Sequence, residues 1–278
     1  MDSRARVQRL AERVLPPGLS RRLKSIAPSY GFSGDYPSWE AARRASSGYD
    51  GASVLEKVRA AALKVKRGEA WAERDSVLLP EGDYPYPLLA ALLRAAARDS
   101  LELSVLDFGG SLGSSYFQCR RFLTPLRRLE WSVVEQANYV ACGRVDFADD
   151  QLAFFDDVDA CLAARRPNVL LLSSVLPYVE RPQALLEMLV QKSFPTIIVD
   201  KTPFGAGARD RLTVQKAMPD IYDASYPAWL LGKEPFLAFM RERYDCVAEF
   251  VALQDWMFDA ARAPCLGFIF ELRTSSSS

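Results

Sequence analysis

Residues 104–118 read Ser-Val-Leu-Asp-Phe-Gly-Gly-Ser-Leu-Gly-Ser-Ser-Tyr-Phe-Gln, and this stretch decides the fold. A short apolar run with one carboxylate, Asp107, is interrupted by glycines at positions 109, 110 and 113, and an aromatic-containing segment follows. An apolar run that stops at glycine and resumes as a helix is typical of the strand–turn–helix start of a ligand-binding α/β unit. The glycines let the backbone turn sharply and let a ligand approach main-chain N–H groups.

Two enzyme motifs compete for this loop, and the sequence argues against both. The dinucleotide fingerprint Gly-x-Gly-x-x-Gly fails because positions 111 and 114 are serines. Residues 109–113 do spell Gly-x-Ser-x-Gly, the nucleophile elbow of the α/β-hydrolases, with Ser111 as the nucleophile. That chemistry needs a histidine to accept the serine proton, and the chain has none. A plain βα turn without a ligand is the remaining structural alternative.

The composition excludes several classes of protein. The 278 residues contain 35 basic and 35 acidic side chains, so no global field attracts nucleic acid. No apolar run is long enough for a transmembrane helix, and charged residues interrupt the N-terminus where a signal peptide would be apolar. Five cysteines without a Cys-x-x-Cys spacing argue against a zinc cluster and a disulfide scaffold. We therefore expect a cytoplasmic protein.

The absence of histidine also restricts the chemistry. Imidazole bases and histidine-bearing metal sites are excluded, so a proton must be moved by a carboxylate, Tyr, Lys, Cys or water. No sequence motif supports a metal site, a carboxylate-held Mg²⁺ included. A reaction that needs little acid–base assistance is favoured.

The chain divides into three parts by pattern. Residues 1–100 are expected to form a largely helical extension, residues 101–272 an α/β domain, and residues 273–278 a disordered tail. Residues 1–27 are basic with apolar residues at helical spacing. This segment is consistent with weak contact to an anionic membrane surface, or with a solvated helix that folds back on the domain or frays.

Polar side chains follow several predicted strands of the α/β domain. Trp131 to Glu135 is an apolar run that ends in an acid, which in a βαβ unit is placed to accept the hydroxyls of a ribose or to cap a helix. Residues 149–155 predict a third strand, closed by Asp156 and Asp157. Val169 to Leu172 is an uninterrupted apolar run, as in a strand buried on both faces, and Ser173 and Ser174 follow it.

The remaining pattern completes the sheet. Residues 196–200 predict a fifth strand that ends at Asp200, and residues 246–253 and 264–272 predict two late strands. Residues 204–229 are expected to form a long irregular insertion, and loops of that length in a compact domain are usually lids or binding loops.

The loop and the strand ends together resemble the class I S-adenosylmethionine-dependent methyltransferases. Asp107, Gly109, Gly110, Ser111 and Gly113 are similar to motif I of that family, with Ser111 in place of its central glycine. The resemblance implies a Rossmann-like, doubly wound α/β sheet of about seven strands, mostly parallel with a C-terminal antiparallel hairpin. It also implies S-adenosyl-L-methionine as cofactor, bound by these residues and by Glu135, Gln136, Ser173 and Ser174. In the resembling family a polar side chain at the end of the third strand meets the adenine amino group, which implies that role for Asp156 or Asp157; capping of the next helix by Asp157 is an equally good explanation.

More closely, the sequence resembles one bacterial family of methyltransferases that is associated with surface-polysaccharide and O-antigen biosynthesis. The glycine loop, Val-Val-Glu-Gln and Ser-Ser-Val-Leu-x-Tyr support the likeness, and Gly48-Tyr49-Asp50 extends it toward the N-terminus. The implied partner is a small-molecule or glycan acceptor, methylated on a hydroxyl. Catalysis is expected to be chiefly in-line positioning, and Asp200, Tyr178 and Tyr116 are the candidate bases.

Two other functions remain open at this point. One is an oxidoreductase that binds NAD(P) or a nucleotide sugar on a similar sheet. The other is a non-catalytic relative of the methyltransferases that acts as an assembly partner. The acceptor, the oligomeric state and membrane attachment are not encoded in any motif of the sequence.

Overall fold

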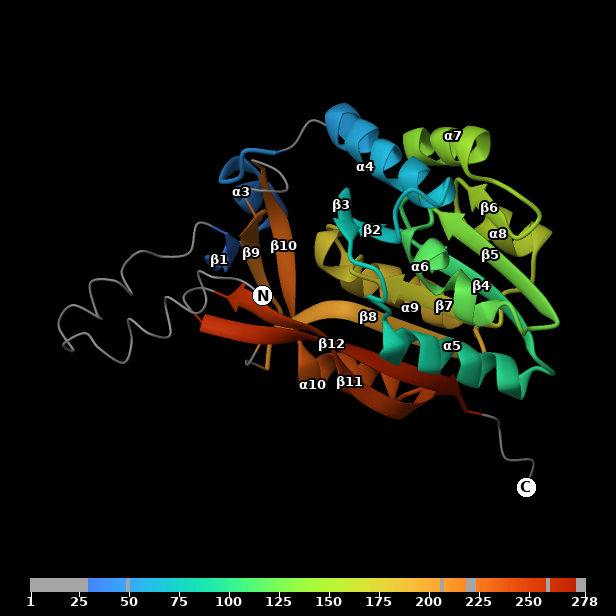
Figure 1. Cartoon of the computed structure of the whole chain (residues 1–278). Helices are drawn as coiled ribbons and strands as arrows, with labels where there is room; N and C mark the ends of the chain where they lie inside the picture. Colours follow the sequence, from blue (N-terminus) through green and yellow to red (C-terminus); the bar gives the residue numbers. More distant parts are fainter. Residues whose placement is uncertain (1–29, 49–50, 206–207, 219–223, 259–260, 274–278) are drawn as a thin grey trace, which may run out of the picture.

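The computed structural model describes residues 30–48, 51–205, 208–218, 224–258 and 261–273, which are arranged around one large sheet (Figure 1). The central strands of this sheet form at the apolar runs, because a strand covered on both faces needs apolar side chains on both of them. These strands are β4 (Glu102–Phe108), β5 (Arg128–Val134), β6 (Leu152–Phe155), β7 (Val169–Ser173) and β8 (Thr196–Gly205).

The five central strands are parallel, and their order across the sheet is β6-β5-β4-β7-β8. Within this parallel part, the chain first forms β4 in the middle, then β5 and β6 on one side of it, and then crosses over to form β7 and β8 on the other side. The crevice at such a reversal, outside the carboxyl ends of the strands, is where open α/β sheets bind ligands. Here it lies between β4 and β7, beside the glycine loop.

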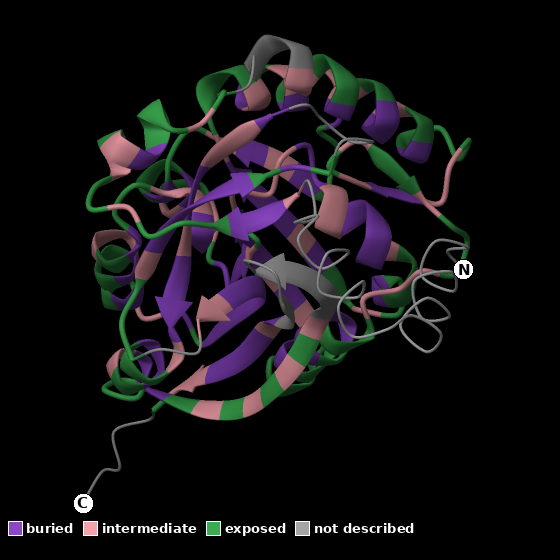
Figure 2. Cartoon of the chain, turned by 90° about the vertical axis from the view of Figure 1, so that its left-hand side faces the viewer, coloured by how far each residue is buried: buried purple, intermediate pink, exposed green. Residues whose placement is uncertain are grey.

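Helices cover both faces of the sheet, and the alternation of side chains along each strand explains how. Val105 and Leu171 face one apolar core, whereas Leu106 and Leu170 face the other. Figure 2 shows the buried residues concentrated in the sheet between the helices. The first core is covered by α4 (Gly51–Lys66), α5 (Tyr86–Arg98), α6 (Ser114–Leu123) and α7 (Ala137–Asp146), the second by α8 (Val158–Ala164), α9 (Pro182–Gln191) and α10 (Lys233–Met240).

The C-terminal part of the sheet is antiparallel. β12 (Ala261–Leu272) pairs antiparallel with β8, and β11 (Tyr244–Phe258) pairs antiparallel with β12, so the last strand of the chain lies between β8 and β11. This arrangement confirms the expected doubly wound, mostly parallel sheet with a C-terminal antiparallel hairpin.

The segment expected to be an irregular insertion is instead largely strand. β9 (Arg211–Lys216) and β10 (Ser225–Gly232) form an antiparallel pair, and the short β1 (Gly31–Ser33) joins this pair to β11. The prediction was wrong because Thr213 and Gln215 are polar but fully buried, which hides the alternation of a half-buried strand. These strands stand over the ligand-binding edge and form a second wall for it.

The region before residue 101 contains strands as well as helices. α3 (Trp39–Arg44) precedes α4, and a hairpin of β2 (Ala72–Arg74) and β3 (Val77–Leu79) separates α4 from α5. Ser38 caps α3 by accepting a hydrogen bond from the backbone N–H of Ala41. No helix in the described ranges is long and apolar enough to cross a membrane. The basic segment at residues 1–27, positions 49 and 50 and residues 274–278 lie outside the described residues.

Candidate functional site

A cavity of about 490 Å³ opens at the carboxyl ends of β4, β5 and β7. Its volume lies within the usual range for small-molecule sites, about 300–1,000 Å³. Most of the predicted site residues line it together: Asp107, Gly109, Gly110, Ser111, Glu135, Gln136, Ser173, Ser174 and Tyr178.

The glycine loop turns sharply at the floor of this cavity. Gly109, Ser111 and Gly113 all have φ in the left-handed region, at 73°, 55° and 89°. Gly109 also lies against Val175, and a Cβ at position 109 would be 2.5 Å from the Val175 Cγ2 atom. The Gly109 N–H donates to the carbonyl of Val134 at 2.9 Å, which ties the loop to the end of β5. Gly113 then starts α6 as its N-cap residue.

Asp107 is a buried carboxylate at the end of β4. Its Oδ2 accepts a hydrogen bond from the indole N–H of Trp131 at 3.0 Å, whereas its Oδ1 has no hydrogen-bond partner within the described part of the chain. Burial raises the pKa of Asp107 to about 7. A buried acceptor without a partner is costly, so a ligand that brings a donor or a positive charge to Oδ1 is stabilised here.

Glu135 follows β5 and faces the same cavity. Its Oε2 accepts a hydrogen bond from the backbone N–H of Gln136 at 2.6 Å, and burial raises its pKa above the ordinary value for glutamate. Burial also raises the pKa of a third lining carboxylate, Asp75. The cavity lining contains four carboxylates against the two cations Arg74 and Lys201, and this excess of acidic groups favours a cationic ligand.

Asp156 and Asp157, predicted to meet an adenine, do not line this cavity. Asp156 forms an exposed ion pair with Arg144 at 2.8 Å, and Asp157 caps α8 by accepting from the backbone N–H of Ala160 at 2.7 Å. These contacts are structural. The side chain nearest that role by position is Tyr139 on α7, which lines the cavity next to Gln136.

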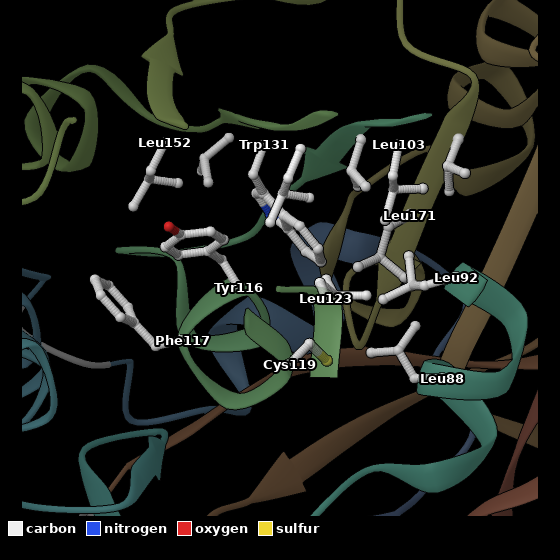
Figure 3. Close-up of a cluster of buried hydrophobic side chains, with 14 of the residues drawn as sticks. Leu88, Leu92, Leu103, Tyr116, Phe117, Cys119, Leu123, Trp131, Leu152 and Leu171 are labelled. Atoms are coloured by element: carbon white, nitrogen blue, oxygen red, sulfur yellow. The ribbon is translucent and has the colours of Figure 1, made fainter. Parts of the chain in front are cut away.

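Tyr116 also lies away from the cavity. Its ring packs in the apolar core against Trp131, with ring centroids 5.9 Å apart, and its hydroxyl donates to Gln151 at 3.0 Å (Figure 3). The residues on the cavity side of the same helix are Ser114, Ser115 and Gln118. The structure thus places the Tyr116 hydroxyl outside the site in which a base would act.

Asp200 is buried behind the cavity wall. Its Oδ2 accepts from the Ser173 hydroxyl at 2.9 Å and pairs with the Lys201 ammonium at 2.9 Å. Lys201 also donates to Ser173 at 3.2 Å, and it adopts a left-handed φ of 49°. Lys201 and Ser173 line the cavity, whereas Asp200 does not. Asp200 therefore orients its two partners, and Lys201 is a site residue that the sequence pattern did not single out.

The far end of the cavity is aromatic and polar. Tyr178 donates to the amide oxygen of the buried Gln215 at 2.7 Å, and its ring meets Tyr226 edge-on with centroids 5.6 Å apart. Trp39, from α3, lines the same space. Burial raises the pKa of Tyr178 well above its usual value, so its phenol is a neutral hydrogen-bond donor. An uncharged ligand with a flat or apolar face fits these side chains.

The β2–β3 hairpin supplies a third wall through Glu73, Arg74 and Asp75. Glu73 is buried and accepts hydrogen bonds from the Ser114 hydroxyl and from the Ser76 N–H, and burial raises its pKa to about 7. Asp75 and Ser76 both have positive φ, as a two-residue hairpin turn requires. The sequence pattern did not lead to a prediction of this hairpin, although charged residues alternate with apolar ones within residues 71–79.

The part of the chain that the structure describes contains no cluster of three or more potential metal-ligating side chains. The cysteines found there, all of them unpaired, are distributed across the core and the sheet rather than at the cavity. The functional groups at the site include carboxylates, a lysine, an arginine, phenols and backbone N–H groups.

Comparison with protein-family models and with curated proteins found no match. Solved structures with a similar arrangement include the N-terminal domain of EvdMO1 in the presence of SAH and D-fucose, at 14% identity and a TM-score of 0.45 over 81% of this chain and 98% of that one. The glycopeptide N-methyltransferase MtfA complexed with sinefungin shows 12% identity and a TM-score of 0.44 over 77% and 96%. CalS10, an amino pentose methyltransferase from Micromonospora echinaspora with SAM bound, shows 13% and 0.42 over 69% and 93%. The strand order β6-β5-β4-β7-β8 by itself defines the doubly wound fold of this chain.

Proposed function

We propose that this chain is an S-adenosylmethionine-dependent methyltransferase. The observation that supports it most is the cavity at the carboxyl edge of the sheet, which joins the glycine loop, the unsatisfied oxygen of Asp107 and the Glu135 carboxylate. These groups match a ligand with an ammonium group, a sulfonium group and a ribose.

The residues present fit the parts of this cofactor. Asp107 and the backbone of residues 109–111 would hold the amino-acid end, and Glu135 would accept the ribose hydroxyls. The adenine would lie against Tyr139 and the apolar side chain of Val58, which line the cavity together with Gln136. The bound cofactor supplies an activated methyl group on a sulfonium, and the acidic lining stabilises that positive charge.

The acceptor would lie at the aromatic end of the cavity. We infer a hydroxyl of a saccharide or of another small molecule, because Tyr178, Tyr226 and Trp39 offer apolar faces and phenols beside the amide of Gln215. Holding the acceptor oxygen in line with the methyl group would provide most of the catalysis. Asp75, a carboxylate that lines this cavity from the hairpin turn, is placed to accept the hydroxyl proton, unlike Asp200, which does not line the cavity and pairs with Lys201.

Calorimetric titration with S-adenosylhomocysteine tests the proposal directly. We expect Glu135→Ala to weaken binding by about 1–3 kcal/mol, since a half-buried acceptor for the ribose hydroxyls is lost. Asp156→Asn is the matched control, because that exposed carboxylate pairs with Arg144 outside the cavity. Unchanged affinity in Glu135→Ala would remove Glu135 from the site.

Thermal unfolding in the presence of different ligands separates the rival functions. A wild-type protein that is stabilised in thermal unfolding by NAD(P) but not by S-adenosylhomocysteine would be an oxidoreductase-type binder, since a ligand that binds the native state raises its stability. A protein that binds S-adenosylhomocysteine yet transfers no methyl group to any offered glycan or small molecule would support the non-catalytic assembly role. Mass spectrometry of ligand that co-purifies with the protein distinguishes the same cases.

A further inference from the structure

Arg74 differs from the other cation in the cavity wall. Lys201 is held by Asp200 and Ser173, so its charge is already matched. Arg74 lies half-buried in the lining and interacts electrostatically with its sequence neighbours Glu73 and Asp75, but among the residues that the structure describes none forms a hydrogen bond or a close ion pair with its guanidinium. A guanidinium is always charged and presents five donors in a planar fork, so one left unpaired in a cavity is suited to bind an anionic group of a ligand.

The position of Arg74 determines which part of a ligand it meets. The neighbouring Glu73 accepts a hydrogen bond from the Ser114 hydroxyl, and Ser114 is the first residue of α6, directly after the glycine loop. This contact fixes the hairpin against the end of the cavity that contains the loop and Asp107. Arg74 follows Glu73 in β2 and lines the same cavity, so we infer that it lies on the side of the proposed amino-acid end of the cofactor.

The acidic lining of the cavity favours a cation at the place where the carboxylate of the cofactor would lie. Four carboxylates line the cavity, those of Glu73, Asp75, Asp107 and Glu135. They suit the ammonium and sulfonium groups of the cofactor but repel its carboxylate, because like charges at close range in a poorly solvated site destabilise each other.

We propose that Arg74 binds the carboxylate of the cofactor's amino-acid end through its guanidinium, so that the β2–β3 hairpin closes the cofactor site over the glycine loop. This inference rests on the proposed function. A carboxylate pairs with a guanidinium through two parallel N–H···O bonds, which fixes orientation as well as charge. The hairpin, contributed by the N-terminal region, would thus select a cofactor with a free amino-acid carboxylate.

Calorimetry with two adenosyl thioethers tests the assignment. S-adenosylhomocysteine has the amino-acid end, and 5′-methylthioadenosine lacks it but keeps the adenosine and the sulfur. We expect Arg74→Gln to weaken binding of S-adenosylhomocysteine roughly 10- to 100-fold, as for loss of a charge-assisted pair. Binding of 5′-methylthioadenosine should stay within about twofold of wild type, because this ligand has no carboxylate to lose.

Two further variants separate the role of Arg74 from a general effect on the fold. Arg74→Lys keeps the positive charge but lacks the planar guanidinium, so its affinity for S-adenosylhomocysteine should lie between those of Arg74→Gln and the wild type. Arg67→Gln, an exposed arginine at the end of α4, should bind both compounds like wild type. Equal weakening of both compounds, or no weakening of either, in Arg74→Gln would overturn the assignment. Binding of neither compound by the wild type would contradict the proposed function itself.

Discussion

Gly110→Ala is expected to weaken binding of the proposed cofactor by on the order of 100-fold or more while leaving a folded protein. A Cβ at this position would be 2.5 Å from both the Cγ and the Oδ2 of Asp107. The Asp107 carboxylate cannot rotate away, because it is buried and its Oδ2 accepts from Trp131. The loop must therefore shift and misplace the N–H groups that would hold the ligand. Loss of several such hydrogen bonds corresponds to a weakening on the order of 100-fold or more.

Calorimetry with S-adenosylhomocysteine measures this effect, and chemical denaturation measures the accompanying loss of stability. Overpacking of this kind costs about 1–3 kcal/mol of unfolding free energy. Gly68→Ala is the control, because Gly68 has a φ of 77° and open space where the Cβ would lie. That variant should lose about 1 kcal/mol from the left-handed conformation alone and bind the ligand normally. A Gly110→Ala protein with wild-type affinity would show that the glycine loop is an ordinary turn.

The centre of the fold was predictable because its physical signals are local. The strand that contains Val105 and the strand of residues 169–172 are apolar on both faces, and glycine ends the first of them. The order in which such strands alternate with helices leaves few arrangements besides a doubly wound sheet. The polar residues at the strand ends followed from the same argument, since the carboxyl ends of parallel strands share one edge.

The second wall of the cavity depends on contacts that are distant in sequence. Thr213 is buried because its hydroxyl donates to the carbonyl of Ala228 at 2.6 Å, and Gln215 because its amide accepts from Tyr178. Neither partner is visible from the local pattern, so the segment reads as a polar loop. The hairpin at Glu73 was missed for the same reason, since its buried carboxylate is stabilised by Ser114, forty-one positions later.

Side-chain direction is the other property that the sequence did not determine. The predicted strand ended at Asp200, but β8 continues to Gly205; Asp200 lies opposite Ser173, the last residue of β7, and its carboxylate pairs with Ser173 and Lys201 instead of lining the cavity. Tyr116 is two residues beyond the start of α6 and points into the core, whereas Ser114 and Ser115 face the cavity. A shift of one residue on a helix changes the face by about 100°. The candidate bases could thus be named by type and region but not by orientation.

The stability of the unliganded protein is expected to fall steeply as the pH rises from about 5 to 7. Burial raises the pKa of both Asp107 and Glu73 to about 7, from 3.8 and 4.5. Between these values the native state holds protons that the unfolded chain has released, so the unfolding free energy decreases with increasing pH. Each group contributes up to about 1.4 kcal/mol per pH unit in this window, and the slope levels off once the pH exceeds the native pKa values.

Urea denaturation at pH 5, 6, 7 and 8 measures the slope. Asp107→Asn keeps an acceptor for the Trp131 N–H, and Glu73→Gln keeps one for Ser114, but neither new side chain titrates. Each variant should flatten the curve, and the double variant should flatten it most. Asp156→Asn removes an exposed carboxylate outside the cavity and should leave the slope unchanged. If wild-type stability rose between pH 5 and 7, the two buried carboxylates would have to be matched by positive charge in the free protein, and the acidic character assigned to the cofactor site would be wrong.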